Sequence, residues 1–231
     1  MGRPHRASEG GFVYHVLNRG NAGMTVFDDQ GDFDAFEKVL AEAVERTDTR
    51  LLAYCLLPNH WHLLVWPRKK GELSQFVRWL TLTHTQRWHA HRPDVGNGHV
   101  YQGRFKSFPV QEDEHFYAVA RHVERNALRA NLVPRAEAWP WCSLYRWLRG
   151  TADDKPVLAS WPLRRKSGWV EWVNAPPNEA ELTAIRRSVE RGNPYGSESW
   201  NERTIRRLGL ELTIRPRGRP RKEPAAHQSG S

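Results

Sequence analysis

Two histidines one residue apart, His60 and His62, lie in an apolar run that spans residues 56–65. Alternate side chains of a β-strand lie on the same face, so both imidazoles are predicted to project from one side of a strand. Neighbouring imidazole nitrogens can bind a metal ion, and a metal ion beside a phosphodiester can polarise it for attack. The pair alone does not define a metal site, so its interpretation depends on the rest of the chain.

Composition points to a polyanionic partner. The 231 residues include 35 Lys and Arg against 26 Asp and Glu, a formal net charge of +9, which favours nucleic acid. Two cysteines exclude a disulfide framework and a cysteine-rich zinc site. The sequence opens with no secretory segment, and no apolar run approaches the ~20 residues of a membrane span. We therefore expect a cytoplasmic, nucleoid-associated protein.

The histidine pair must be positioned by strands and helices that the pattern predicts. Residues 12–20 form a first strand closed by a glycine turn, and residues 32–43 form a helix with one apolar stripe. Residues 50–57 are a second strand, which Pro58 and Asn59 interrupt before the strand continues over residues 60–65.

Further helices and a strand follow the histidine pair. Residues 72–89 have helical spacing, and a basic segment over residues 100–108 leads into a strand through Val110. Acidic residues 112–114 begin another helix that runs to about Leu128. This order predicts an α+β fold, a ferredoxin-like βαββαβ sandwich.

The composition changes after about Gly150, which suggests three parts. Residues 8–150 are predicted to form the main domain, residues 151–212 a tryptophan-rich accessory region, and residues 213–231 a basic, disordered tail. Helices are predicted over residues 179–190 and near residues 200–208. They could form a small helical module, or the region could simply be a packed tail.

The tail has a Gly-Arg-Pro core flanked by basic residues. Its arginines, Arg217, Arg219 and Arg221, resemble an AT-hook, an extended segment that places arginines in the narrow minor groove of A·T-rich DNA. The alternative is a disordered, solubilising basic tail.

Four sequence runs together resemble the REP-associated tyrosine transposases, relatives of the single-strand transposases that carry the HUH motif (His, hydrophobic residue, His). The resemblance covers about residues 10–150. The runs are Tyr14-His15-Val16 with Asn18-Arg19-Gly20, Leu57-Pro58-Asn59-His60-Trp61-His62, Tyr101-Gln102-Gly103-Arg104-Phe105-Lys106-Ser107 and His122-Val123-Glu124-Arg125-Asn126-Ala127-Leu128-Arg129-Ala130.

The resemblance implies an HUH nuclease domain that cleaves and rejoins single-stranded DNA beside an imperfect or palindromic hairpin. In the family a divalent metal lies on the two histidines and on a polar residue of the later helix. Histidine and amide-oxygen ligands suit Mn²⁺ somewhat better than Mg²⁺, so the choice between these two ions stays open. His60 and His62 match the histidine pair, and Asn126 matches the helix residue. A helix tyrosine of the family attacks the scissile phosphate and becomes linked through a 5′-phosphotyrosine.

The sequence departs from the family at this nucleophile. The tyrosine position, four residues before the asparagine, is His122 here. Positions 122 and 126 share a helix face, but the hydroxyl is missing. Three interpretations follow: a DNA-binding protein, such as a regulator, that no longer cuts; direct attack by His122 through a phosphohistidine; or attack by another residue or a metal-bound water. Tyr117 lies ~140° round the helix from position 122, and Tyr101 lies in the basic segment.

Several basic residues near the predicted site could neutralise phosphates, although each could also be an ordinary solvated surface charge. They are Arg19, Arg104, Lys106, Arg125 and Arg129. An RNA-binding module is a third function class, which the AT-hook-like tail disfavours. The resemblance includes both dimeric insertion-sequence enzymes and relatives that act as monomers, and a homodimer is the hypothesis taken here.

Overall fold

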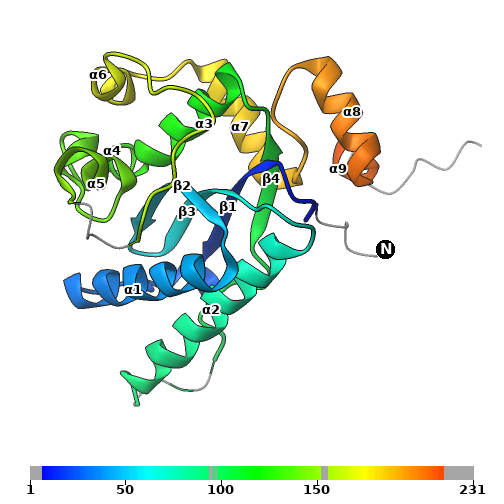
Figure 1. Cartoon of the computed structure of the whole chain (residues 1–231). Helices are drawn as coiled ribbons and strands as arrows, with labels where there is room; N and C mark the ends of the chain where they lie inside the picture. The colour runs from blue at the N-terminus through cyan, green and yellow to red at the C-terminus, as the bar shows by residue number, and fades with distance from the viewer. Residues whose placement is uncertain (1–6, 94–95, 97, 152–155, 216–231) are drawn as a thin grey trace, which may run out of the picture.

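A four-stranded antiparallel sheet forms the centre of the computed structural model, which describes residues 7–93, 96, 98–151 and 156–215 (Figure 1). The strands are β1 (Val13–Arg19), β2 (Arg50–Leu57), β3 (His60–Trp66) and β4 (Lys106–Val110), in the order β2-β3-β1-β4. With helix α1 after β1 and helix α2 after β3, this order is the predicted ferredoxin-like βαββαβ arrangement. The α+β prediction is confirmed.

The histidine strand is the second arm of a hairpin. The sequence pattern suggested one strand interrupted at Pro58 and Asn59, whereas these residues reverse the chain, and Leu57 pairs directly with His60. The backbone amides of Val26 and Phe27 both donate to the Pro58 carbonyl at the turn. The reversal places His60 at the start of β3.

One face of the sheet is covered by α1 (Gln30–Thr47) and α2 (Glu72–Ala90), which lie side by side below the sheet in Figure 1. A short 3₁₀ turn, η1 (Asn21–Gly23), links β1 to this layer. The Asp29 side chain begins α1 by accepting a hydrogen bond from the Asp32 amide. Alternation in β1 sends Tyr14 and Val16 into this core.

The other face carries His15 and His62 and is crossed by α3 (Glu114–Glu124). The one-turn helix α4 (Asn126–Arg129), the 3₁₀ turn η2 (Ala136–Ala138), α5 (Ser143–Arg149) and α6 (Trp169–Asn174) complete this layer. Asp113 begins α3 by accepting from the His115 amide at 2.9 Å. Phe116, Val119 and Val123 of α3 pack against the sheet.

The helix α3 ends four residues earlier than the sequence pattern predicted. It stops at Glu124, and α4 starts at Asn126 after a break at Arg125. The side-chain amide of Asn126 donates to the His122 carbonyl at 2.8 Å, so a side chain satisfies one of the acceptors at the helix end.

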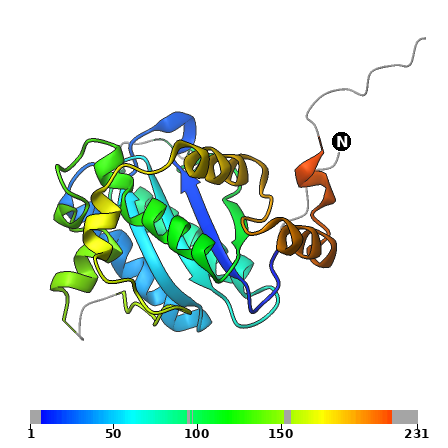
Figure 2. The same ribbon diagram turned by 90° about the horizontal axis from the view of Figure 1, so that it is seen from above.

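The predicted C-terminal helices occur as α7 (Glu179–Arg191) and α8 (Glu198–Leu208), followed by the short α9 (Glu211–Ile214). Helix α7 packs against β4 and beside α3, as Figures 1 and 2 show. It ends at Arg191, and the next residue, Gly192, has a φ of +77° that suits glycine. The strand-like contact between Tyr195 and Pro109 then holds the following turn to β4.

Helices α8 and α9 lie at the edge of the molecule (Figures 1 and 2), beside the first described residues, 7–12. Ile205 and Leu208 of α8 join the core on the α1 side, and Trp200 packs edge-on against Phe12. The predicted tail arginines, Arg217, Arg219 and Arg221, lie outside the described residues. Within residues 7–93, 96, 98–151 and 156–215, no helix is long and apolar enough to cross a membrane.

Candidate metal and nucleic-acid site

Strand register gathers the polar residues of the site on one sheet face. Arg19 lies opposite His60 and Leu17 lies opposite His62, so all four side chains project to the same side. His15, two residues before Leu17, projects to that side as well. Helix α3 crosses this face and adds His122 from its last turn.

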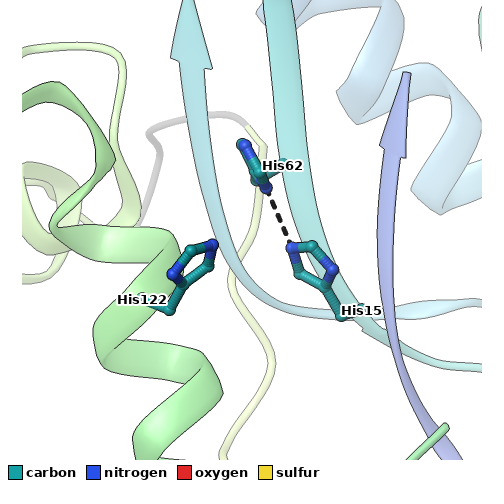
Figure 3. Close-up of side chains that lie close together, drawn as sticks. All are labelled: His15, His62 and His122. Atoms are coloured by element: carbon teal, nitrogen blue, oxygen red, sulfur yellow. Dashed lines mark hydrogen bonds between the residues drawn. The ribbon is translucent and has the colours of Figure 1, made fainter. Parts of the chain in front are cut away.

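Three of these histidines meet at one point, although they come from three separate elements. Figure 3 shows His15 of β1, His62 of β3 and His122 of α3 directed toward one another. One nitrogen of each ring lies within 4.8 Å of the other two. His15 Nε2 and His62 Nδ1 are 2.9 Å apart and share a hydrogen bond. We call these three residues the histidine triad.

His60 lies next to the triad. Its ring centroid is 5.1 Å from that of His62, as expected for the predicted His-x-His pair. Its Nδ1 hydrogen-bonds with the Asn59 Oδ1 at 2.6 Å, which leaves Nε2 for another partner. The predicted pair is therefore adjacent on one face, but the tightest cluster includes His15, which the sequence analysis did not select.

All four imidazoles are held uncharged near neutral pH. Burial lowers the pKa of His15 to about 3, and burial together with Arg19 and Arg129 lowers the pKa of His60 to about 4. The pKa values of His62 and His122 lie well below the ordinary range because of burial first and of His15 second. A neutral imidazole has a nitrogen lone pair available for a metal ion.

Asn126, the predicted third ligand, is fully buried one turn beyond His122. Its amide nitrogen donates to the His122 carbonyl, and its Oδ1 accepts from Arg129 at 2.8 Å. Asn126 is absent from the residues that line the pocket above the histidines. To bind a metal ion, Asn126 Oδ1 would have to exchange Arg129 for that ion, so its predicted ligand role stays a prediction.

A pocket of about 360 Å³ opens above His60, His62 and His122, and we call it the basic pocket. Its cationic side chains come from β1, β4 with the segment before it, α4 and α7. Among the described residues that line it, Glu190 is the acidic one. The cations are Arg19, Arg104, Lys106, Arg129 and Arg186.

The basic pocket includes four of the five DNA-binding residues predicted from the described chain. The exception, Arg125, lies outside it and donates to the carbonyls of Val173 and Asn174 at the end of α6. Arg121 donates to the next two carbonyls, those of Ala175 and Pro176. Through these contacts Arg125 holds the segment between α6 and α7 against α3.

The alternative tyrosines lie away from the triad. The Tyr117 hydroxyl donates to the Arg164 carbonyl at 2.6 Å. The Tyr101 hydroxyl lies on the other side of the sheet, where it contacts Trp61 Nε1 and His84 Nδ1. Within the part of the chain that the structure describes, no tyrosine lines the basic pocket.

Sequence reasoning missed two residues of the site, His15 and Arg186. His15 was part of a quoted motif, and strand alternation already put it on the face of Leu17 and Arg19. What the sequence lacked was the strand register, which brings it beside His62. Arg186 lies far beyond the last motif, which ends at Ala130, on a helix whose packing on β4 carries no sequence signal.

The donor set fits a divalent metal ion. Imidazole nitrogens suit borderline transition metals, whereas Mg²⁺ prefers oxygen ligands. His15 Nδ1 is buried without a hydrogen-bond partner, so the His15 ring is held mainly through the nitrogen that faces His62. An ion bound there would supply Lewis acidity to a phosphodiester in the basic pocket.

Comparisons with known proteins bear on the family and on the fold. The family model described as "Transposase IS200 like" matches residues 10–126. A solved REP-associated tyrosine transposase bound to a REP hairpin is 16% identical, with a TM-score of 0.53 over 72% of this chain and 100% of that chain. A Deinococcus radiodurans R1 protein with a provisional transposase description is 18% identical, with a TM-score of 0.39 over 55% and 95% of the two chains. No curated protein matches the chain.

Proposed function

Because the chain belongs to the IS200-like transposase family, we propose that it binds single-stranded DNA beside a hairpin, with the DNA backbone in the basic pocket. A protein with a similar fold is described as bound to a REP hairpin, which supports a hairpin ligand here. DNA binding would place the protein at the nucleoid in the cytoplasm.

The observation that carries this proposal is the charge of the basic pocket. Five cationic side chains surround the histidines, and the exposed arginines among them can form bidentate hydrogen bonds with phosphate. Neutralising several phosphates releases counterions, so affinity should fall steeply with salt. The neutral imidazoles below add no charge of their own.

The test is equilibrium binding of a labelled hairpin with a single-stranded flank, in EDTA, over a range of salt concentrations. Arg104→Ala and Lys106→Ala should each weaken binding and reduce the slope of log K against log [salt] by about one. Arg206→Ala removes an exposed cation of α8 paired with Glu202 and is the matched control. Equal losses from all three variants, or binding that ignores salt, would contradict the proposal.

Metal-assisted cleavage and rejoining of the DNA strand is a second candidate function. The observation that favours it is the position of His60 and His62 at the base of the basic pocket, held neutral by burial. A divalent ion on these residues supplies Lewis acidity. The cations of the pocket would hold the phosphodiester above them and stabilise charge that develops on it.

The nucleophile decides between cleavage and binding alone. A covalent-adduct assay tests this with the native protein and His122→Tyr, each mixed with labelled hairpin DNA and Mg²⁺ or Mn²⁺. A neutral denaturing gel preserves an acid-labile phosphohistidine. An acid-labile adduct of the native protein that is lost in His122→Phe would identify His122 as nucleophile, and cut DNA without an adduct would indicate water. If only His122→Tyr reacts, the native protein is a DNA-binding protein on a nuclease scaffold.

We propose further that the protein forms a homodimer and that its tail contacts A·T-rich minor grooves, as the resemblance and the Gly-Arg-Pro core suggest. Light scattering checks the first point, because a single species with the mass of one chain would contradict it.

A further inference from the structure

The histidine triad has the form of a metal-binding site that differs from the set matched by sequence. Its members leave the sheet and α3 toward one common space (Figure 3). Each offers a nitrogen within 4.8 Å of the others. The exposed fractions of His15, His62 and His122 are 0%, 5% and 8%, so water has little access to these rings. Side chains buried this well are held in place by their surroundings.

The contact between His15 and His62 is unusual for a structural hydrogen bond. Two neutral imidazoles meet through Nε2 and Nδ1 at 2.9 Å, so one ring must donate its single proton to the other. If His15 donates there, its buried Nδ1 is an acceptor without a partner. If His62 donates instead, the Nδ1 of His15 carries a proton without an acceptor. Either state costs free energy in a dry interior.

A bound ion would remove the need for the two rings to share a proton, while His15 Nδ1 would still carry a proton without an acceptor. With both facing nitrogens acting as ligands, neither has to donate a proton to the other, and each ring keeps its proton on its outer nitrogen. A site with three histidine nitrogens is typical of zinc.

We propose that His15, His62 and His122 together bind a transition-metal ion of the zinc class, with His122 serving as a ligand. This inference rests on the proposed function only in that both concern the same pocket. The proposal gives a role to His122, which stands at the family's tyrosine position. His122 supplies the third nitrogen ligand, whereas a tyrosine there would present an oxygen. The proposal also predicts a preference for Zn²⁺ or Co²⁺ over Mg²⁺.

Co²⁺ titration of the metal-free full-length protein, without DNA, tests the site through its visible absorption. His15→Gln and His122→Gln should each weaken Co²⁺ binding by ~100-fold or more, because even outer-shell partners of a ligand contribute ~10–100-fold. His115→Gln, which removes a histidine of α3 that lies outside the triad and pairs with Asp113, is the matched control and should change the affinity less than about threefold. If His60→Gln abolishes binding and His15→Gln does not, the sequence-matched set holds the metal and the triad proposal is wrong.

A second measurement avoids variants that fail to fold. Histidine ring NMR of the native protein with and without Zn²⁺ should show changes at His15, His62 and His122 and a smaller change at His60. No saturable change with Zn²⁺ would overturn the triad proposal. Hairpin binding is measured separately in EDTA. A failure of the triad to bind metal would therefore leave the proposed DNA binding standing, and a failure to bind the hairpin would leave the metal result standing.

Discussion

The buried histidines of the site make the stability of the protein depend on pH. The pKa of His15 is lowered to about 3 and that of His60 to about 4, whereas an unfolded chain has values near 6.5. Between pH 6.5 and 4 the unfolded state therefore binds protons that the folded state does not. Each residue should reduce the free energy of unfolding by about 1.4 kcal/mol per pH unit as the pH falls through this window.

Urea denaturation of the metal-free protein at several pH values checks this prediction. His15→Phe should flatten the dependence by about one proton. Val16→Ala, a core change in the same strand, should lower stability equally at all pH values and leave the slope unchanged. An unchanged slope in His15→Phe would show that His15 does not titrate as its burial requires.

The buried carboxylate of Glu124, at the end of α3, accepts hydrogen bonds from α5 and from α6. It is fully buried and accepts hydrogen bonds from Ser143 Oγ at 2.8 Å and Trp169 Nε1 at 2.6 Å, and Arg165 lies 3.3 Å away. Glu124→Ala would leave these donors and a guanidinium without their acceptor.

We expect Glu124→Ala to lower the free energy of unfolding by about 3–5 kcal/mol, as for other broken buried pairs. Glu202→Ala removes an exposed partner of Arg206 and should cost less than about 0.5 kcal/mol. Chemical denaturation measures both. Similar losses in the two variants would mean that the buried contacts are not important for stability.

At the scale of elements, periodic patterns were sufficient for α1, α2, α7 and α8, because one apolar stripe on each helix faces the core. The hairpin of β2 and β3 was harder to predict. Residues such as Pro58 and Asn59 occur both where a strand is interrupted and where the chain reverses, so their types do not distinguish the two cases. The early end of α3 depends on the Asn126 side chain. That contact leaves no mark in the hydrophobic pattern.

Arg125, which follows the last residue of α3, and Arg186 of α7 both lie near the site, and their contacts predict opposite effects. Arg186 of α7 lines the basic pocket, so Arg186→Ala should weaken hairpin binding and reduce the salt slope by about one. It should leave thermal stability nearly unchanged, because the residue is exposed.

Arg125 instead holds the end of α6 through two backbone carbonyls. Arg125→Ala should increase cleavage by a protease within residues 160–178 and lower stability by about 1–3 kcal/mol, because buried acceptors lose a charged donor. Affinity for DNA should change little. Limited proteolysis and binding isotherms of the two variants separate the roles, and the reverse pattern would return Arg125 to the DNA interface.

For the whole molecule, the tail and the folded body are predicted to bind different forms of DNA. Removing residues 216–231 deletes Arg217, Arg219 and Arg221 and should abolish any preference for A·T-rich duplex. Hairpin binding in the basic pocket should persist with a smaller salt dependence. Competition with A·T-rich and G·C-rich duplexes measures this, and an undiminished A·T preference in the truncated protein would assign it to the folded part.

Only part of the site could be predicted, because some of its residues are positioned by spacing within one element and others by contacts between elements. His60, His62 and His122 lie in motifs where spacing within one element fixes their geometry. His15 and Arg186 depend on contacts between elements, which are the pairing of β1 with β3 and the packing of α7 on β4. Local sequence carries the first kind of information and only the folded chain carries the second.

The late position of α7 also bears on synthesis at the ribosome. Strands β1–β4 and helix α3 have been translated when the chain reaches Glu124. Helix α7, which contributes Arg186 to the basic pocket, ends at Arg191. At ~5–20 residues per second, that helix follows roughly 3 to 13 s later. The segments that carry the four imidazoles are thus synthesised before α7, and full DNA affinity should arise only after α7 has been made.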